Sequence, residues 1–212
     1  KNDGQYNDVL LDRNVMKAFP KVELHRHLEG TFHLPTLHAI AMRNGIDCPH
    51  DFENFKKTVQ FPRDNPPDFL LFLSKFKNHW YRTFADIEEI TYKSLIQLKD
   101  EGIVYEEIRF SPEHFSLQND FNRMDVSRLV IDTGLRAAKD AGFDLRFLIT
   151  FNRAKQTEEE MLSLYKDLQG LKEPSIVGID LAGDELNYPP QLFQTFFDQV
   201  KADAKYGITV HA

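Results

Sequence analysis

Two histidines that flank a single arginine form the first candidate site. His25 and His27 lie near the end of an apolar stretch, and side chains two residues apart in a strand point to the same face. Both imidazoles can therefore reach one metal ion, and neutral imidazole suits zinc, cobalt or iron. Such a pair also arises by chance, because the chain holds 8 histidines. The carboxylate of Glu29 and the glycine at position 30, which follow directly, favour a metal site.

A third histidine, His211, follows the β-branched residues Ile208, Thr209 and Val210. A lone histidine at a strand end is usually an ordinary hydrogen-bonded residue, but a barrel could aim this one at the same point as His25 and His27. Three imidazoles with one open position are typical of a catalytic zinc site, in which the pKa of water falls to ~7. We therefore predict that these three histidines bind Zn²⁺.

The segment LAGDE at 181–185 is the next candidate. A glycine directly after a buried strand lets the backbone approach a ligand closely, so the N–H of Gly183 could donate to a heteroatom. The alternative is a simple turn with two solvated acids, Asp184 and Glu185.

Other polar residues at predicted strand ends are Ser111, Glu113 and Asn152. The remaining histidines, which we interpret as surface or packing residues, are His33, His38, His50, His79 and His114.

Five short strands, apolar or β-branched and running into polar residues, would position these side chains. The predicted strands cover residues 22–28, 104–110, 145–151, 176–181 and 208–211, and amphipathic helices lie between them. The expected helix signals are a capping box at Thr157 with a stop at Gly170, a cap at Asp125 with a stop at Gly142, and an apolar stripe from Phe193 to Ala204 that ends at Gly207. Residues 61–68 form a proline-broken loop.

The alternation of strands and helices at intervals of roughly 30–40 residues predicts βαβ units and a parallel sheet. A doubly wound sheet that bound nucleotides would usually carry a glycine-rich turn, and neither G-x-G-x-x-G nor G-x-x-x-x-G-K-[ST] occurs. A (β/α)8 barrel gathers its chemistry at the carboxyl ends of its strands, so we predict a TIM-type barrel. Because eight strands need typically ~250 residues, we expect residues 1–212 to be one incomplete domain, about the first five β/α units of a longer protein.

Composition narrows the class of protein. Hydrophobic residues make up 42% of the 212, enough for a sizeable core. The net charge of −7 argues against binding of nucleic-acid phosphates, and no apolar run approaches the ~20 residues that span a membrane. Residues 1–10 lack the apolar segment of a signal peptide, and the single cysteine, Cys48, cannot form an internal disulfide. We therefore expect a soluble cytoplasmic protein.

Four segments resemble the adenosine deaminase family of metal-dependent amidohydrolases. They occur in the family's order and near its spacing, from about Phe19 to the end. The segments are PKVELHRHLEG at 20–30, VYEEIRFSP at 104–112, IDLAGDE at 179–185 and TVHA at 209–212. The resemblance implies an amidohydrolase barrel that removes the 6-amino group of adenosine, a small-molecule purine nucleoside, by hydrolysis to inosine and ammonia.

The resemblance also implies roles for single residues. His25, His27 and His211 match the family's zinc ligands. Gly183 matches the glycine whose N–H meets purine N3, and Glu29 matches a carboxylate that contacts the ribose.

The segment FLSKF at 72–76 resembles the family's helix whose two aromatic rings shield the substrate. The i, i+4 spacing of Phe72 and Phe76 would place both rings on one helix face, although hydrophobic packing explains them equally well. Ser111 and Asp184 complete the set of substrate-binding residues that we predict.

No catalytic acid is expected within the chain. In the family the acid that protonates ring N1 is a glutamate two residues beyond the position of Ala212, and a later histidine and aspartate complete the site. We therefore expect this polypeptide alone to be inactive. Many family members carry aspartate at the position of Glu29, which leaves an adenine or modified-adenine deaminase, or a non-catalytic metal- or nucleoside-binding remnant, as alternatives. A cytidine-deaminase zinc site is excluded, because it needs a P-C-x-x-C element.

Overall fold

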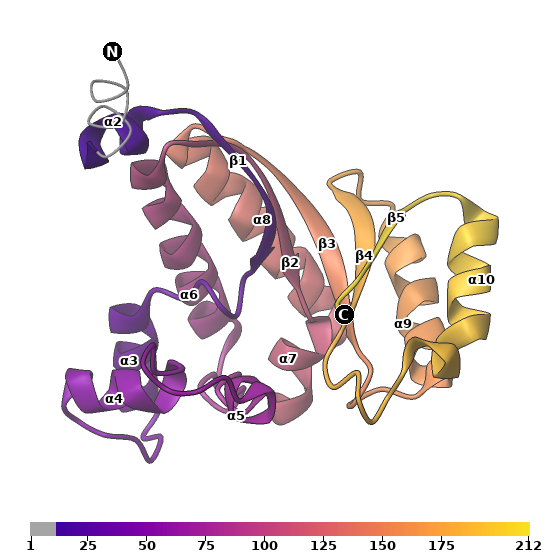
Figure 1. Cartoon of the computed structure of the whole chain (residues 1–212), viewed down its shortest axis with the longest axis horizontal. Helices are drawn as coiled ribbons and strands as arrows, with labels where there is room; N and C mark the ends of the chain where they lie inside the picture. The colour runs from indigo at the N-terminus through magenta and orange to yellow at the C-terminus, as the bar shows by residue number, and fades with distance from the viewer. Residues whose placement is uncertain (1–11) are drawn as a thin grey trace, which may run out of the picture.

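The structure is a computed structural model and describes residues 12–212 (Figure 1). Five strands form one sheet in the order β1-β2-β3-β4-β5, and each neighbouring pair is parallel. Their bounds are β1 (Lys21–His27), β2 (Ile103–Phe110), β3 (Asp144–Asn152), β4 (Ile176–Ala182) and β5 (Gly207–Val210). The five predicted strands are therefore confirmed to within one residue at either end.

Helices connect the consecutive strands, so the chain forms a partial (β/α) barrel, as predicted. The helix α2 (Arg13–Ala18) precedes β1. Between β1 and β2 lie α3 (Leu34–Arg43), α4 (Phe52–Val59), α5 (Phe69–Leu73), α6 (Phe84–Ile96) and the 3₁₀ helix η1 (Gln97–Glu101). The later connections hold α7 (Pro112–Ser116), η2 (Leu117–Asn119), α8 (Arg123–Ala141), α9 (Glu158–Leu171), η3 (Pro190–Phe193) and α10 (Gln194–Asp203).

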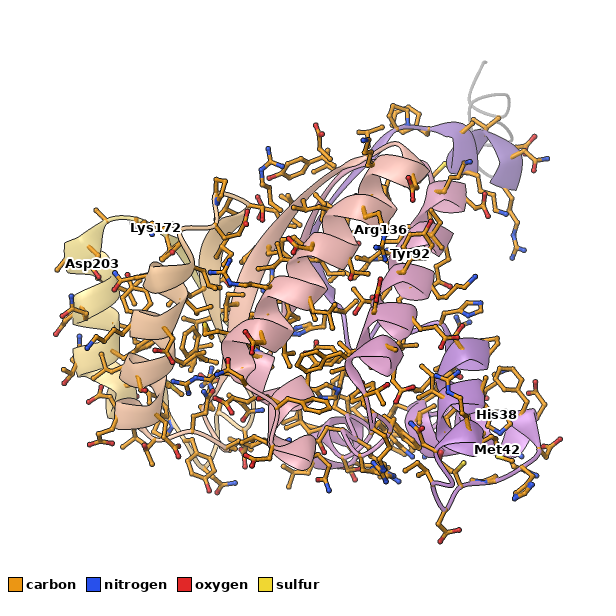
Figure 2. The ribbon with its side chains drawn as sticks, turned by 180° about the vertical axis from the view of Figure 1, so that it is seen from behind. His38, Met42, Tyr92, Arg136, Lys172 and Asp203 are labelled. Carbon is orange, nitrogen blue, oxygen red and sulfur yellow. The ribbon has the colours of Figure 1, made fainter. Side chains whose placement is uncertain are left out.

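The outer face of the sheet is covered by helices. Figure 1 shows α6 and α8 against the first three strands and α9 with α10 beside β4 and β5. Figure 2 shows the same molecule from behind, where α6 and α8 run side by side. There the guanidinium carbon of Arg136 lies 5.3 Å from the centre of the Tyr92 ring, a cation–π contact that joins the two helices.

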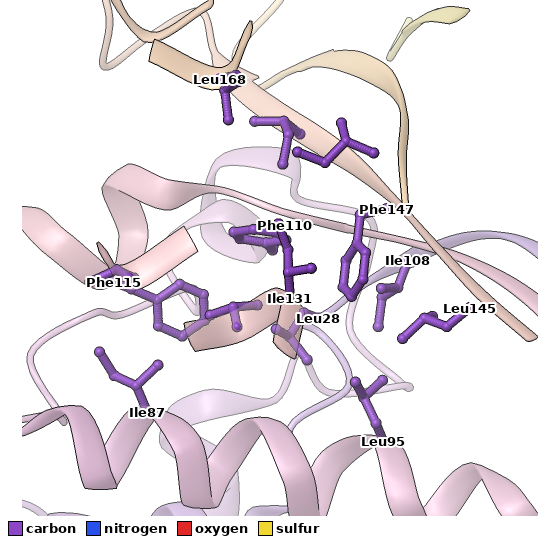
Figure 3. Packing of buried hydrophobic residues seen from close by; sticks show 14 of the residues in the cluster. Leu28, Ile87, Leu95, Ile108, Phe110, Phe115, Ile131, Leu145, Phe147 and Leu168 are labelled. Carbon is purple, nitrogen blue, oxygen red and sulfur yellow. The ribbon is translucent and has the colours of Figure 1, made fainter. Parts of the chain in front are cut away.

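The apolar core lies between the sheet and these helices (Figure 3). Phe110 and Phe147 project from β2 and β3, with ring centres 5.9 Å apart, and both are fully buried. The α8 residue Gly134 lies against Phe147, because a Cβ there would come within 2.8 Å of the Phe147 ring and 3.2 Å of Leu95. Each such side chain contributes ~1.5–3 kcal/mol by burial, so this cluster anchors the strands that carry the site.

The predicted capping box of α9 is confirmed. The Thr157 hydroxyl accepts from the Glu160 N–H, and the Glu160 carboxylate accepts from the Thr157 N–H. The predicted stop at Gly170 is wrong, because the helix runs to Leu171 and ends at Lys172 with a φ of 51°. One more helical residue allows Leu171 to pack against the core, which Gly170 cannot do.

Two other predicted helix ends also move. Asn122, and not Asp125, caps α8 by accepting from two backbone N–H groups, whereas the predicted stop at Gly142 is confirmed by its φ of 85°. The helix α10 ends at Asp203 with Ala204 in the left-handed region, before the predicted stop at Gly207. Gly207 instead begins β5, and its carbonyl oxygen would lie only 3.0 Å from a Cβ at Gly178, so position 178 favours glycine.

The connections after β1 and β2 gather at one end of the sheet. Figure 1 shows α3, α4, α5 and α7 at the end toward which the strands run. The expected loop at 61–68 is confirmed, since it contains neither helix nor strand. Within residues 12–212, no helix combines the length and apolar character needed to cross a bilayer.

Candidate metal centre and purine site

Three imidazoles meet at the carboxyl ends of the outer strands. His25 and His27 close β1, and His211 directly follows β5, where its N–H continues the ladder to the Leu181 carbonyl. The Nε2 atom of His211 lies 2.9 Å from that of His25 and 3.0 Å from that of His27. Potential ligand atoms of all three residues lie within 4.8 Å of one another. The predicted convergence of these side chains is therefore present in the structure.

This donor set fits a zinc ion. Two ligands of one zinc cannot lie more than about twice the Zn–N distance of ~2.0–2.1 Å apart, and the separations of His211 Nε2 from the other two Nε2 atoms satisfy this limit. Burial, followed by the neighbouring charge of His211, lowers the pKa of His27 to about 4. Burial and then the charge of Arg109 also lower the pKa of His25. Both rings are therefore neutral near pH 7, which is the form that binds metal.

A buried carboxylate orients the third imidazole. Asp180 of β4 is fully buried, and its Oδ1 lies 3.1 Å from His211 Nδ1 and accepts from the Thr209 hydroxyl at 2.7 Å. Burial alone would raise the pKa of Asp180, but the hydrogen bonds from His211 and Thr209 and the charge of Arg109 lower it. An ionised Asp180 accepts the Nδ1 proton of His211, so the lone pair of Nε2 faces the cluster.

Comparison with known proteins agrees with this geometry. The model of the family described as "Adenosine deaminase" matches residues 20–212. The chain belongs to the adenosine deaminase family. An adenosine deaminase of Edwardsiella ictaluri (strain 93-146) is 31% identical to it over 203 residues, which cover 93% of this chain and 59% of that protein. The chain thus spans less than two thirds of the length of this relative.

Solved structures share the fold. The crystal structure of an adenine deaminase from Arthrobacter aurescens has a TM-score of 0.77 and 25% identity, covering 90% of this chain and 57% of that one. An amidohydrolase from Burkholderia ambifaria, solved with bound Zn, has a TM-score of 0.81 at 22% identity and covers 93% of this chain and 53% of that one. At that identity the second likeness concerns the fold alone.

Glu29, which the family resemblance relates to the ribose, lies just past the metal cluster. Its Oε1 accepts from the Ser111 backbone N–H at 2.7 Å, so the turn after β1 is tied to the end of β2. Burial raises the pKa of Glu29 to about 7, although the hydrogen bond from Ser111 acts in the opposite direction. The Ser111 side chain is not used in this contact, so its predicted role at the substrate stays a prediction.

Gly183, which the family resemblance relates to purine N3, follows β4 in a conformation that favours glycine. Its φ is +103°, and a Cβ would lie 2.7 Å from the side-chain oxygen of Asn152. The next residue, Asp184, directs both carboxylate oxygens to Asn187, at 3.2 Å from its N–H and 2.6 Å from its side-chain amide. Asp184 therefore shapes this loop, and its predicted contact with the substrate stays a prediction.

The two aromatic residues proposed as a shield do not lie on one helix face. The helix α5 has only five residues and ends at Leu73, so Phe76 lies beyond it. The chain turns after Ser74, yet the rings of Phe72 and Phe76 still meet with centres 5.2 Å apart. A Cβ at Gly30 would lie 3.6 Å from the Phe76 ring, so this pair stands beside the turn that holds Glu29.

The remaining histidines lie outside the metal cluster. His114 lies 3.1 Å from the Tyr81 hydroxyl, and burial lowers the pKa of His114 to about 3. His38 stacks on Phe55 with ring centres 4.6 Å apart. Both are packing residues, which agrees with their interpretation from sequence.

Sequence reasoning missed the polar residues behind the ligands. Arg109 of β2 and Asp180 of β4 are charged residues within strands, yet they are only 3% and 0% exposed. A charge in a buried strand must be paired, which is the signal that could have indicated them. A second buried arginine, Arg153, donates to the carbonyl oxygen of His211 at 2.6 Å and so holds the backbone of the third histidine.

Proposed function

We propose that the protein containing this chain catalyses the zinc-dependent hydrolysis of adenosine to inosine and ammonia. The convergence of His25, His27 and His211, separated by up to 186 residues, carries this proposal. Membership of the adenosine deaminase family and the 31% identity to a protein of that name support it.

In this proposal His25, His27 and His211 would hold the zinc ion. A bound zinc ion supplies Lewis acidity and lowers the pKa of water to ~7, so that a nucleophile for purine C6 is available near neutral pH. The chain's own residues bind and orient the purine nucleoside. The Gly183 N–H meets purine N3, Glu29 contacts the ribose, and Phe72 and Phe76 exclude water from one side of the substrate.

The activity is proposed for the whole protein and not for residues 1–212 alone. The family resemblance assigns the acid that protonates N1 to a position beyond Ala212, so we propose that this polypeptide by itself binds metal without turning over adenosine. Proton donation to the ring is what prevents negative charge from building on it.

A second candidate substrate is adenine or a modified adenine. Glu29 is longer than the aspartate common at this position, and its Oε1 is already bound by the Ser111 N–H at 2.7 Å. The fixed carboxylate therefore extends farther toward a ligand than an aspartate would, which leaves less room for a ribose. The 25% identity to an adenine deaminase supports the same alternative.

The test measures ultraviolet absorbance of adenosine, adenine and N6-methyl-AMP incubated with the whole protein, first loaded with zinc and then stripped by a chelator. We expect adenosine absorbance to fall only with the zinc-loaded form. Faster loss with adenine or N6-methyl-AMP would transfer the assignment to the second candidate. If no purine reacts although zinc is bound, the protein is a non-catalytic metal-binding remnant.

The ligand assignment is tested by His25→Ala. This variant should lose activity while its far-ultraviolet circular dichroism stays nearly unchanged, because His25 is exposed at the strand end and contributes little to the core. An unaltered rate in this variant would refute the assignment. His50→Ala, which changes a histidine outside the metal cluster, is the matched control.

A further inference from the structure

Arg109 occupies a special place on the inner face of the sheet. It lies near the end of β2, is 3% exposed, and makes contacts with three other strands. Its Nη2 donates to the Leu24 carbonyl of β1 at 2.8 Å, whereas its Nη1 lies 3.1 Å from Asp180 Oδ1 and 3.4 Å from the Thr209 hydroxyl of β5. One guanidinium group thus reaches both strands that carry the histidines.

On the β1 side, Arg109 binds an irregular point of the strand. The pairing of β1 with β2 shifts between Glu23 and Arg26, where three residue steps of β1 face two steps of β2. This β-bulge contains Leu24 and His25, and bulges often re-aim side chains near functional sites. The Leu24 carbonyl to which Arg109 donates therefore belongs to the peptide group immediately before the first histidine.

On the β5 side, Arg109 acts through Asp180. The same Oδ1 that contacts Arg109 also receives His211 Nδ1 at 3.1 Å and the Thr209 hydroxyl at 2.7 Å. The sheet itself offers no such link, because β1 and β5 are its two outer strands and do not pair with each other within residues 12–212. The pairs between neighbouring strands fix only local register.

We infer that Arg109 is a positioning residue that clamps β1 to the Asp180–His211 pair and so holds His25, His27 and His211 at metal-binding distance before the ion arrives. The inference rests on the proposed metal centre but adds a residue that touches no metal. Without the clamp, the histidines on β1 and β5 would be free to move apart, and metal binding would have to bring them together.

The two-pronged shape of arginine is essential to this role. Its Nη1 and Nη2 atoms point to Asp180 and to Leu24 at the same time. A lysine carries the same charge as a single point and can face the carboxylate or the carbonyl, but it lacks the rigid fork that satisfies both. The lysine variant should therefore keep part of the function, whereas a methionine should lose all of it.

The experiment titrates the metal-free full chain with Co²⁺ and follows both the dissociation constant and the visible absorption bands of the bound ion. Arg109→Lys and Arg109→Met are compared with Arg123→Met. Arg123 is the matched control, because it joins α8 to Asp167 of α9 at 2.6 Å and to Glu113, away from the three histidines. Circular dichroism and thermal unfolding establish that each variant is folded.

We expect Arg109→Met to weaken Co²⁺ binding at least tenfold and to change the absorption bands, since residues behind a metal site typically alter affinity 10–100-fold. Arg109→Lys should fall between Arg109→Met and the wild type, and Arg123→Met should bind like the wild type. A folded Arg109→Met or Arg109→Lys variant with wild-type affinity and spectrum would overturn the clamp, as would equal weakening in Arg123→Met. If the wild type itself fails to bind Co²⁺, the proposed metal centre is wrong, which is a distinguishable result.

Discussion

Glu106 is a buried acid on the outer face of β2, and its replacement by glutamine tests the electrostatics of this fold. Glu106 is fully buried, and neither carboxylate oxygen has a hydrogen-bond partner within residues 12–212. The nearest cation is Arg26, whose Nε lies 3.5 Å from Oε1, and the acids Glu23 and Glu101 share the same surroundings. Burial therefore raises the pKa of Glu106 from its ordinary 4.5 to about 7, against the opposing effect of Arg26.

The size of the effect follows from proton linkage. Between pH 4.5 and pH 7 the folded protein keeps a proton on Glu106 that the unfolded chain releases, so the free energy of unfolding falls as pH rises through this window. A difference of 2.5 pKa units corresponds to about 3 kcal/mol, all of which is lost above pH 7. The Glu106→Gln variant has no carboxyl to ionise at this position, so it does not lose this stability as the pH rises. Burial of its amide lowers the free energy of unfolding by the same amount at every pH.

The assay is urea denaturation at pH 5 and pH 8.5. The free energy of unfolding of Glu106→Gln minus that of the wild type should be roughly 2–3 kcal/mol larger at pH 8.5 than at pH 5. Glu159→Gln, which removes an exposed carboxylate in the first turn of α9, should show the same small difference at both pH values. A pH-independent difference for Glu106→Gln would refute the argument that this buried acid is destabilised by ionisation.

Two more substitutions test local features of the site region. Gly183→Ala should destabilise the protein at least twice as much as the ~1 kcal/mol expected for Gly45→Ala. Both glycines have positive φ, but only at Gly183 would a Cβ lie 2.7 Å from Asn152. Equal shifts of the two melting temperatures would contradict this expectation. His114→Gln should reduce the loss of stability that occurs as the pH falls from 6.5 to 4.5. The unfolded chain protonates His114 in this range, whereas burial holds the pKa of His114 in the folded protein at about 3. If urea denaturation gives the same pH dependence for the variant and the wild type, His114 is not the group responsible.

The strands could be predicted from sequence because each is a short segment rich in apolar or β-branched residues that leads into polar residues. The meeting of His25 and His27 with His211 followed from one topological rule, which is that parallel strands bring their carboxyl ends to one edge. The helix ends were harder, because a stop signal competes with packing. At Gly170 the helix continues since Leu171 gains a contact with the core.

The polar network behind the histidines could not be predicted from periodicity. Alternation within β2 and β4 indicates the face on which Arg109 and Asp180 lie, but not that they meet, because the two residues belong to strands separated by β3. Their contact depends on the curvature of the sheet and on the stagger of its strands. Neither the curvature nor the stagger can be deduced from the periodicity of the sequence.

The bulge in β1 explains how charged and metal-binding residues share one strand. In a regular strand Glu23 would point to the same face as His25 and His27, and Arg26 to the other. Because the bulge inserts one residue, Glu23 instead lies with Arg26, 3.5 Å from it, on the side of Glu106. The Glu23 carboxylate keeps a contact with the backbone of the first histidine, because its Oε1 accepts from the His25 N–H at 3.0 Å. One inserted residue thus separates an outer ion-pair cluster from an inner set of neutral imidazoles, and Arg109 binds the strand at that same irregular point.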